Sequence, residues 1–195
     1  MSLSLSMAAF ALAASISPGP VNVVALSAGA RHGLRASMRH VSGATVGFTL
    51  LLLAIGLGLH GAFLAWPWLA SVLRLTGVVY LLYLAWKLWS DDGRLGGASE
   101  DTRPGYWSGA LMQWLNPKAW LACVAGMGAF VAGGELAVIG RFAAIYFAVC
   151  YVSIACWAAA GSSIRHWVDN PTRLRRFNRA MAVLLAGCAL YLLAW

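Results

Sequence analysis

Asn116-Pro117-Lys118-Ala119 interrupts a long apolar stretch of the chain, and Ser17-Pro18-Gly19-Pro20 interrupts another near the N-terminus. Proline inside a helix removes a backbone donor and clashes with the preceding turn, so each site predicts a broken or kinked helix. A lysine beside such a break in hydrocarbon is costly unless it has a partner or a function. We therefore predict that the two breaks face each other across a substrate site.

The composition is that of a membrane protein. Of the 195 residues, 61% are hydrophobic and 10% are charged, whereas a soluble domain carries roughly 25% charged residues. The net charge of +8 is compatible with a nucleic-acid partner, but eleven of the fourteen Lys and Arg residues lie in three short loops. Membrane orientation explains that distribution better than a nucleic-acid-binding face does. We therefore expect a lipid bilayer around the protein and no nucleic acid.

Runs without charge predict the membrane spans, because about 20 apolar residues cross a hydrocarbon core about 30 Å thick. The first charge is Arg31, and the apolar run before it lacks the basic start of a cleavable signal peptide, so it predicts a first helix over residues 4–28. Further helices are expected over residues 41–60, 68–89, 108–131, 138–161 and 177–195. The expected fold class is an all-α membrane protein with six transmembrane helices.

Basic residues are concentrated in loops on one predicted side of the membrane. They are Arg31, Arg35, Arg39, Lys87, Arg94, Arg103, Arg165, Arg173, Arg175, Arg176 and Arg179. The opposite side carries only Arg74 and Arg141, near its helix ends. Because basic loops remain in the cytoplasm, we expect the N- and C-termini to lie outside.

The two halves of the chain resemble each other. A shift of 99 residues places Pro18 on Pro117 and the first three predicted helices on the last three. With three crossings in each half, the second copy must be inverted in the membrane, as in many transporters with broken helices. We expect one transporter domain, 1–195, made of repeats 1–89 and 108–195 joined by a cytoplasmic loop, 90–107.

Lys118 is predicted to lie at the bilayer midplane. If its helix enters the membrane near residue 108, ten residues place Lys118 about 15 Å deep. One interpretation is structural: the lysine caps carbonyls that Pro117 frees. The other is functional: its ammonium meets a substrate carboxylate or exchanges a proton during transport. Burial would favour the neutral amine and a bound anion the charged form.

Other groups around the two breaks offer complementary chemistry. After Pro18 the helix resumes, so free backbone N–H groups near residues 19–22 can bind an anion. Polar side chains there serve equally well as contacts between helices. The predicted substrate-binding residues are Pro18, Gly19, Pro20, Asn22, Gln113, Asn116, Pro117 and Lys118.

No nucleotide-binding loop, metal-ligand cluster or Ser-His-Asp pattern occurs in the sequence, so we expect no enzyme, no cofactor and no metal site. A transmembrane thiol oxidoreductase is one alternative, but it needs a cysteine in each half, and Val24 stands where Cys123 would have its counterpart. A metal-cation efflux protein is another, but the predicted spans lack carboxylates and paired cysteines. We predict that the four cysteines are small buried hydrophobes: Cys123, Cys150, Cys156 and Cys188.

Several motifs resemble the lysine-exporter and homoserine-exporter superfamily. Pro18-Gly19-Pro20 with Asn22, followed by residues 31–35, resembles its first repeat, and Asn116-Pro117-Lys118-Ala119 resembles its second signature. The similarity covers essentially the whole chain. It implies efflux of amino acids or their derivatives across the bacterial inner membrane, driven by the proton gradient. The expected partners are an amino-acid substrate, the bilayer and, in a homodimer, a second copy of the chain.

The chain also departs from that pattern. Many members carry an acidic residue directly after the second glycine of helix two, where this chain has Phe48, and Pro-Gln-Phe where it has Gly128-Ala129-Phe130. These departures put the coupling mechanism and a specificity for lysine or arginine in doubt. Phe48, Trp86 and Cys156-Trp157-Ala158 are similar to the branch that exports cysteine and O-acetylserine.

Overall fold

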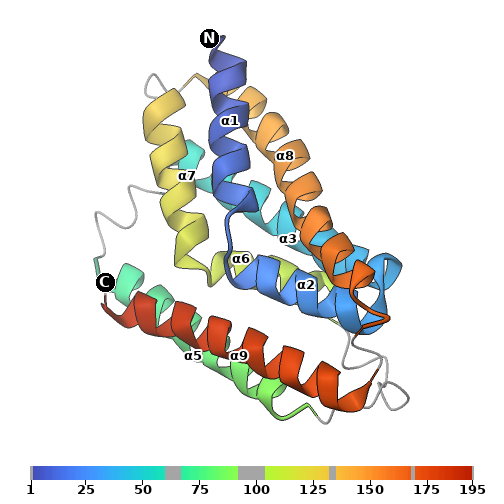
Figure 1. The fold of residues 1–195 in the computed structure, drawn as a ribbon. Coiled ribbons are helices and arrows are strands. Elements are labelled where there is room, and N and C mark those ends of the chain that lie inside the picture. The colour runs from blue at the N-terminus through green and yellow to red at the C-terminus, as the bar shows by residue number, and fades with distance from the viewer. Residues whose placement is uncertain (1, 60–66, 92–103, 132–134, 168–169, 195) are drawn as a thin grey trace.

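The protein is all-helical over the part of the chain that its computed structural model describes, residues 2–59, 67–91, 104–131, 135–167 and 170–194. The elements shown in Figure 1 are α1 (Leu3–Ile16), α2 (Pro20–His32), α3 (Leu34–Ala54), the π-helical turn η1 (Ile55–Leu59), α5 (Pro67–Trp89), α6 (Tyr106–Trp114), α7 (Pro117–Phe130), α8 (Leu136–Ser163) and α9 (Pro171–Ala194). Most of the predicted loop 90–107 lies outside the described residues.

The prolines break two helices where the sequence predicts. Pro20 is the first residue of α2, and the axes of α1 and α2 differ by 62°. Pro117 is likewise the first residue of α7, and two residues separate it from the end of α6. Proline suits this position because its missing N–H would have no partner within the helix anyway. The predicted substrate site therefore lies at helix ends rather than along continuous helices.

Two helices begin earlier than the sequence suggested. We expected α3 to begin at residue 41, but it begins at Leu34, because Gly33 adopts a left-handed φ of 81° and reverses the chain in a single residue. We expected α9 to begin at residue 177, but it begins at Pro171. Several arginines assigned to loops therefore lie on the first turns of helices.

Glycines let the backbones of two pairs of helices pack directly against each other. A Cβ atom at Gly29 or Gly161 would clash with backbone atoms across the contact between α2 and α8. Gly43, Gly47 and Gly109 play the same part between α3 and α6. Small residues permit such close approach between helices. Gly105, in contrast, has no neighbour within 4 Å of a Cβ position.

Two helical segments are long and apolar enough to cross a membrane, Leu34–Gly58 and Leu136–Ser163. The broken pair α1 and α2 adds a third segment if it is counted as one span. These numbers refer to the described residues, so the predicted six crossings remain a prediction. The remaining helices are arranged around these spans, with α5 and α9 packed side by side (Figure 1).

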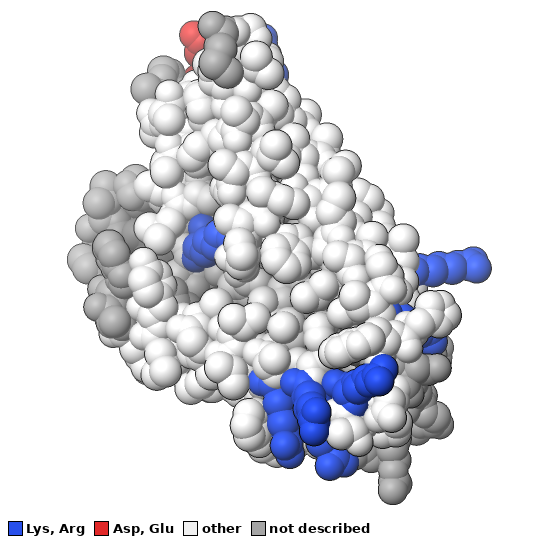
Figure 2. Space-filling model, viewed as in Figure 1, with Lys and Arg blue, Asp and Glu red and all other residues white. Residues whose placement is uncertain are grey.

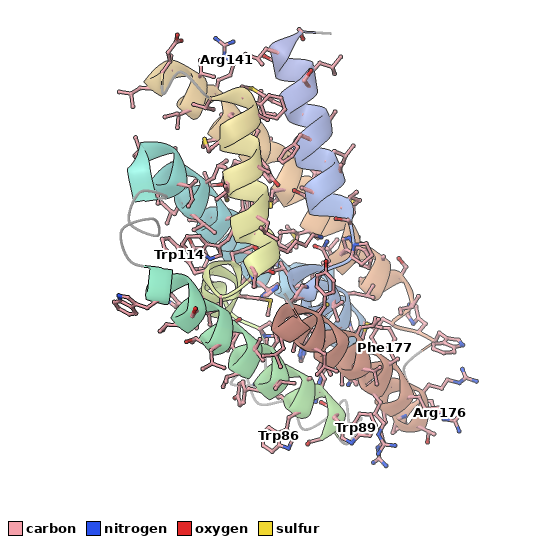
Figure 3. All side chains as sticks on the ribbon, turned by 90° about the vertical axis from the view of Figure 1, so that its left-hand side faces the viewer. Trp86, Trp89, Trp114, Arg141, Arg176 and Phe177 are labelled. Atoms are coloured by element: carbon pink, nitrogen blue, oxygen red, sulfur yellow. The ribbon has the colours of Figure 1, made fainter. Side chains whose placement is uncertain are left out.

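Charge is distributed unequally over the molecule. Figure 2 shows basic side chains gathered at one end, where α9 contributes Arg173, Arg175, Arg176 and Arg179. Arg141 lies at the opposite end from Arg176 (Figure 3). Trp86 and Trp89 lie at the same end as Arg176. This asymmetry agrees with the loop charges from which the orientation was predicted.

The glycine contact between α2 and α8 can be tested by adding a single methyl group. We expect Gly161→Ala to lower the melting temperature of the purified protein, because its Cβ would meet the Leu26 carbonyl, and overpacking costs about 1–3 kcal/mol. Gly140→Ala on the same helix is the control, since nothing lies within 4 Å of that position. Equal melting temperatures for the two variants would contradict the contact.

Candidate functional site

The break between α1 and α2 frees backbone carbonyls at the end of α1. Without water, each freed carbonyl needs a donor from elsewhere in the protein. Asn22, in the first turn of α2, donates through Nδ2 to the carbonyls of Ser15 at 2.8 Å and Ser17 at 2.9 Å. The Ser17 hydroxyl donates to the carbonyl of Ala14 at 3.1 Å. The first broken helix therefore supplies some of the hydrogen-bond donors that its own freed carbonyls need.

The other half of the chain supplies the remaining donors. The Nζ atom of Lys118 donates to the Ser17 carbonyl and the Ser17 Oγ, both at 2.8 Å, and to the Pro18 carbonyl at 3.1 Å. The indole N–H of Trp157 donates to the Ile16 carbonyl at 3.0 Å. An ammonium group has three N–H donors, and Lys118 directs them to three acceptors. The two breaks therefore meet, and Lys118 joins them.

The second break is closed by its own residues. The side chain of Asn116 accepts a hydrogen bond from the Lys118 backbone N–H at 3.1 Å and so caps the start of α7. The Trp120 indole donates to the Trp114 carbonyl at 2.7 Å. The structural interpretation was therefore wrong in one respect: Lys118 caps carbonyls of the first break, not those beside Pro117.

The N-terminus of α2 lies next to the lysine. Gly19 occupies the N-cap position and provides no side-chain cap. A Cβ atom at Gly19 would lie 3.2 Å from the Lys118 Nζ, so the absence of a side chain lets the ammonium approach the backbone. Because a helix N-terminus carries a partial positive charge, α2 and Lys118 together favour an anionic group here.

A small cavity of about 40 Å³ lies at this junction. Asn22, Gln113 and Asn116 line it and are each 5% exposed, and Gly19 and Lys118 line it as well. Pro18, Pro20 and Pro117 do not line it; they shape the backbone that does. A water molecule occupies about 30 Å³ of liquid, so the cavity in this conformation is too small for an amino acid.

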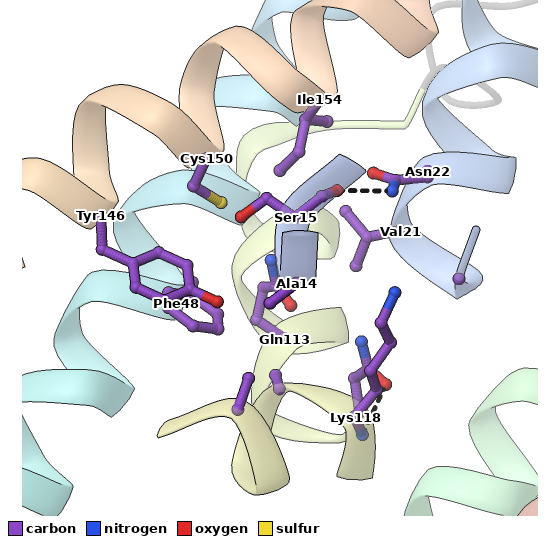
Figure 4. A pocket seen from close by; sticks show the side chains of 14 residues that line it. Ala14, Ser15, Val21, Asn22, Phe48, Gln113, Lys118, Tyr146, Cys150 and Ile154 are labelled. Carbon is purple, nitrogen blue, oxygen red and sulfur yellow. Dashed lines mark hydrogen bonds between the residues drawn. The ribbon is translucent and has the colours of Figure 1, made fainter. Parts of the chain in front are cut away.

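The opposite wall of the cavity was not predicted from the sequence. Tyr146 and Cys150 of α8 and Phe48 of α3 face Lys118 and Asn22 across it (Figure 4). The rings of Phe48 and Tyr146 stack with centroids 4.3 Å apart. Phe48 stands where many relatives were expected to carry an acidic side chain, so in this chain an aromatic pair replaces a charge.

The structure also corrects a prediction about buried groups. His40 of α3 is fully buried. Cys123 and Cys150 are buried as predicted, but Cys156 is exposed and Cys188 is half-buried. Among the described residues, no group of three His, Cys, Asp or Glu side chains is placed to hold a metal ion.

The chain is similar to known proteins over most of its length. Residues 12–194 match the family described as "LysE type translocator". The cysteine/O-acetylserine efflux protein of Salmonella choleraesuis is 31% identical over 191 residues, covering 92% of each chain. The protein of the same name from Escherichia coli O1:K1 is 29% identical over 185 residues, again covering 92% of each. No solved structure gives a significant match.

A variant of Asn22 tests whether its hydrogen bonds stabilise the break between α1 and α2. Replacing Asn22 with Leu leaves the Ser15 carbonyl without its donor and removes one from Ser17, and an unsatisfied buried group costs about 1–3 kcal/mol. We expect a clear fall in the melting temperature of Asn22→Leu. Ser163→Ala removes an exposed hydrogen bond to Ala159 and serves as the control. If the two variants have the same melting temperature, the hydrogen bonds from Asn22 do not stabilise the break.

Proposed function

The chain belongs to the LysE family of translocators and is a transporter rather than an enzyme, and on this premise we propose that it exports a small neutral amino acid or derivative. The relatives named for efflux of cysteine and O-acetylserine support that substrate class. The apolar helices agree with a membrane location, and we assign it to the bacterial inner membrane.

The proposed architecture is two inverted three-helix repeats with six crossings and both termini outside. The helix bounds support this repeat. Under the 99-residue shift, α1 corresponds to α6, α2 to α7, α3 to α8 and α5 to α9. The gathering of basic side chains at one end supports a cytoplasmic position for that end.

The single observation that carries the substrate proposal is the set of three hydrogen bonds from Lys118 to the first break. A substrate carboxylate that takes one of these N–H donors leaves a carbonyl or hydroxyl of Ser17 or Pro18 without its partner. The α-ammonium group of the same substrate can then donate to that acceptor. A zwitterion therefore replaces the bond that it breaks, whereas an anion alone leaves an unsatisfied acceptor.

Transport requires this site to open. Ligand pockets commonly measure about 300–1,000 Å³, and the cavity at Lys118 measures about 40 Å³. In the described conformation the cavity is therefore too small for a substrate. In the proposed alternating-access cycle the two repeats move relative to each other, so that Lys118 and the first break face one side of the membrane at a time. We propose that the proton gradient drives this cycle, with Lys118 exchanging the proton.

Export measurements on Lys118 variants test this function. Cells that overproduce the protein should release more O-acetylserine or cysteine into the medium than cells with Lys118→Ala at equal membrane abundance. Lys118→Arg keeps the positive charge and its donors, so it should retain part of the export. Arg176→Ala, at the basic end, is the control. Unchanged export by Lys118→Ala would contradict the role of this lysine.

A further inference from the structure

A second, larger cavity of about 440 Å³ lies between α2, α5, α6 and α9. Unlike the cavity at Lys118, it falls within the size range of small-molecule sites. Its polar lining groups include Ser27, Arg31, Lys87, Asp91 and Asn178. None of these belongs to the site between the two breaks.

Two buried polar side chains in this cavity indicate a ligand. Asn178 of α9 is 1% exposed, and neither its amide oxygen nor its amide nitrogen has a hydrogen-bond partner among the described residues. Ser27 of α2 is 5% exposed, and its hydroxyl is also unpartnered there. Each unsatisfied group costs about 1–3 kcal/mol, which a bound polar molecule would recover. The amide offers both a donor and an acceptor, so it suits a solute with a polar side chain.

The charges of the cavity add a second preference. Arg31, at the end of α2, forms an ion pair with Asp91, just after α5, and Lys87 and His32 line the same cavity. Among the described lining residues, the charged groups of Arg31 and Lys87 outnumber the single carboxylate, which favours a solute with a carboxylate of its own. Asp91 provides an acceptor for an ammonium group. A zwitterion satisfies both signs of charge.

The two cavities share the walls α2 and α6. Asn22 and Gln113 line the small cavity, and Ser27 and Met112 line the large one. From Asn22 to Arg31 the helix advances about 14 Å, so α2 runs from the site at Lys118 to the basic end of the protein. The two cavities therefore lie beside the same two helices, at different levels along α2.

We propose that the large cavity is an entry site that binds a zwitterionic amino acid or derivative on the basic side before transport. The carboxylate lies among Arg31 and Lys87, the ammonium group lies at Asp91, and the polar side chain reaches Asn178 and Ser27. This inference rests on the proposed function for its direction, since an exporter takes its substrate from the cytoplasm. The binding itself requires only the cavity and its charges.

Thiol protection tests the entry site in the full-length protein. In a background with the four native cysteines replaced, Ser108→Cys places a thiol in the lining of the large cavity, and Ser163→Cys places one at the exposed end of α8. O-acetylserine at about ten times its dissociation constant should slow maleimide labelling of Ser108→Cys about tenfold. O-acetylserine should leave the labelling rate of Ser163→Cys unchanged. Alaninamide, which lacks the carboxylate, should protect neither.

Two further variants separate this site from the central one. Adding Asn178→Leu should remove the protection of Ser108→Cys, whereas adding Lys118→Ala should leave it intact. Equal protection of both thiols, or none at Ser108→Cys in a protein that exports O-acetylserine, would overturn the entry site and leave the exporter proposal standing. Protection of Ser108→Cys without any export would support the entry site and contradict the exporter proposal. Protection that survives Asn178→Leu would overturn the assignment of Asn178.

Discussion

The structure depends on satisfying the carbonyls that the break at Ser17–Pro20 exposes. In an apolar interior these groups have no water to accept from, so the chain must bring donors to them. Asn22 comes from the next turn, and Trp157 and Lys118 come from the second half of the chain. The broken helix is thus completed only when the two halves are packed together. The same bonds place Lys118 at the point where, in the proposed function, a substrate exchanges hydrogen bonds with the backbone.

Two kinds of contact hold the helices together around the junction of the two breaks. Glycines such as Gly29 and Gly161 let the backbones of α2 and α8 pack directly against each other. Lys118 instead makes polar bonds, which a zwitterion can replace without leaving a partner unsatisfied. The small cavity lies where these bonds are made, and the large cavity lies farther along α2.

The broken helices and their prolines could be predicted from the sequence, because proline chemistry is a local property. The partners of Lys118 could not, since Ser17 and Pro18 are about a hundred residues away and the pairing depends on packing. Phe48 and Tyr146 were missed because two aromatics in apolar helices carry no signal of their own. The start of α3 was misplaced because Arg35 and Arg39 suggested a loop, whereas Gly33 turns the chain alone.

A double-mutant cycle between Lys118 and Ser17 tests the central claim most directly. The cycle compares the unfolding free energies of Lys118→Ala, Ser17→Ala and the double variant, each with and without saturating O-acetylserine. We predict a coupling of about 1–3 kcal/mol in the protein alone, because the ammonium donates to the Ser17 hydroxyl at 2.8 Å. We predict a smaller coupling when the amino acid is bound, because its carboxylate takes a donor from Lys118. Additive effects in the protein alone would contradict the account.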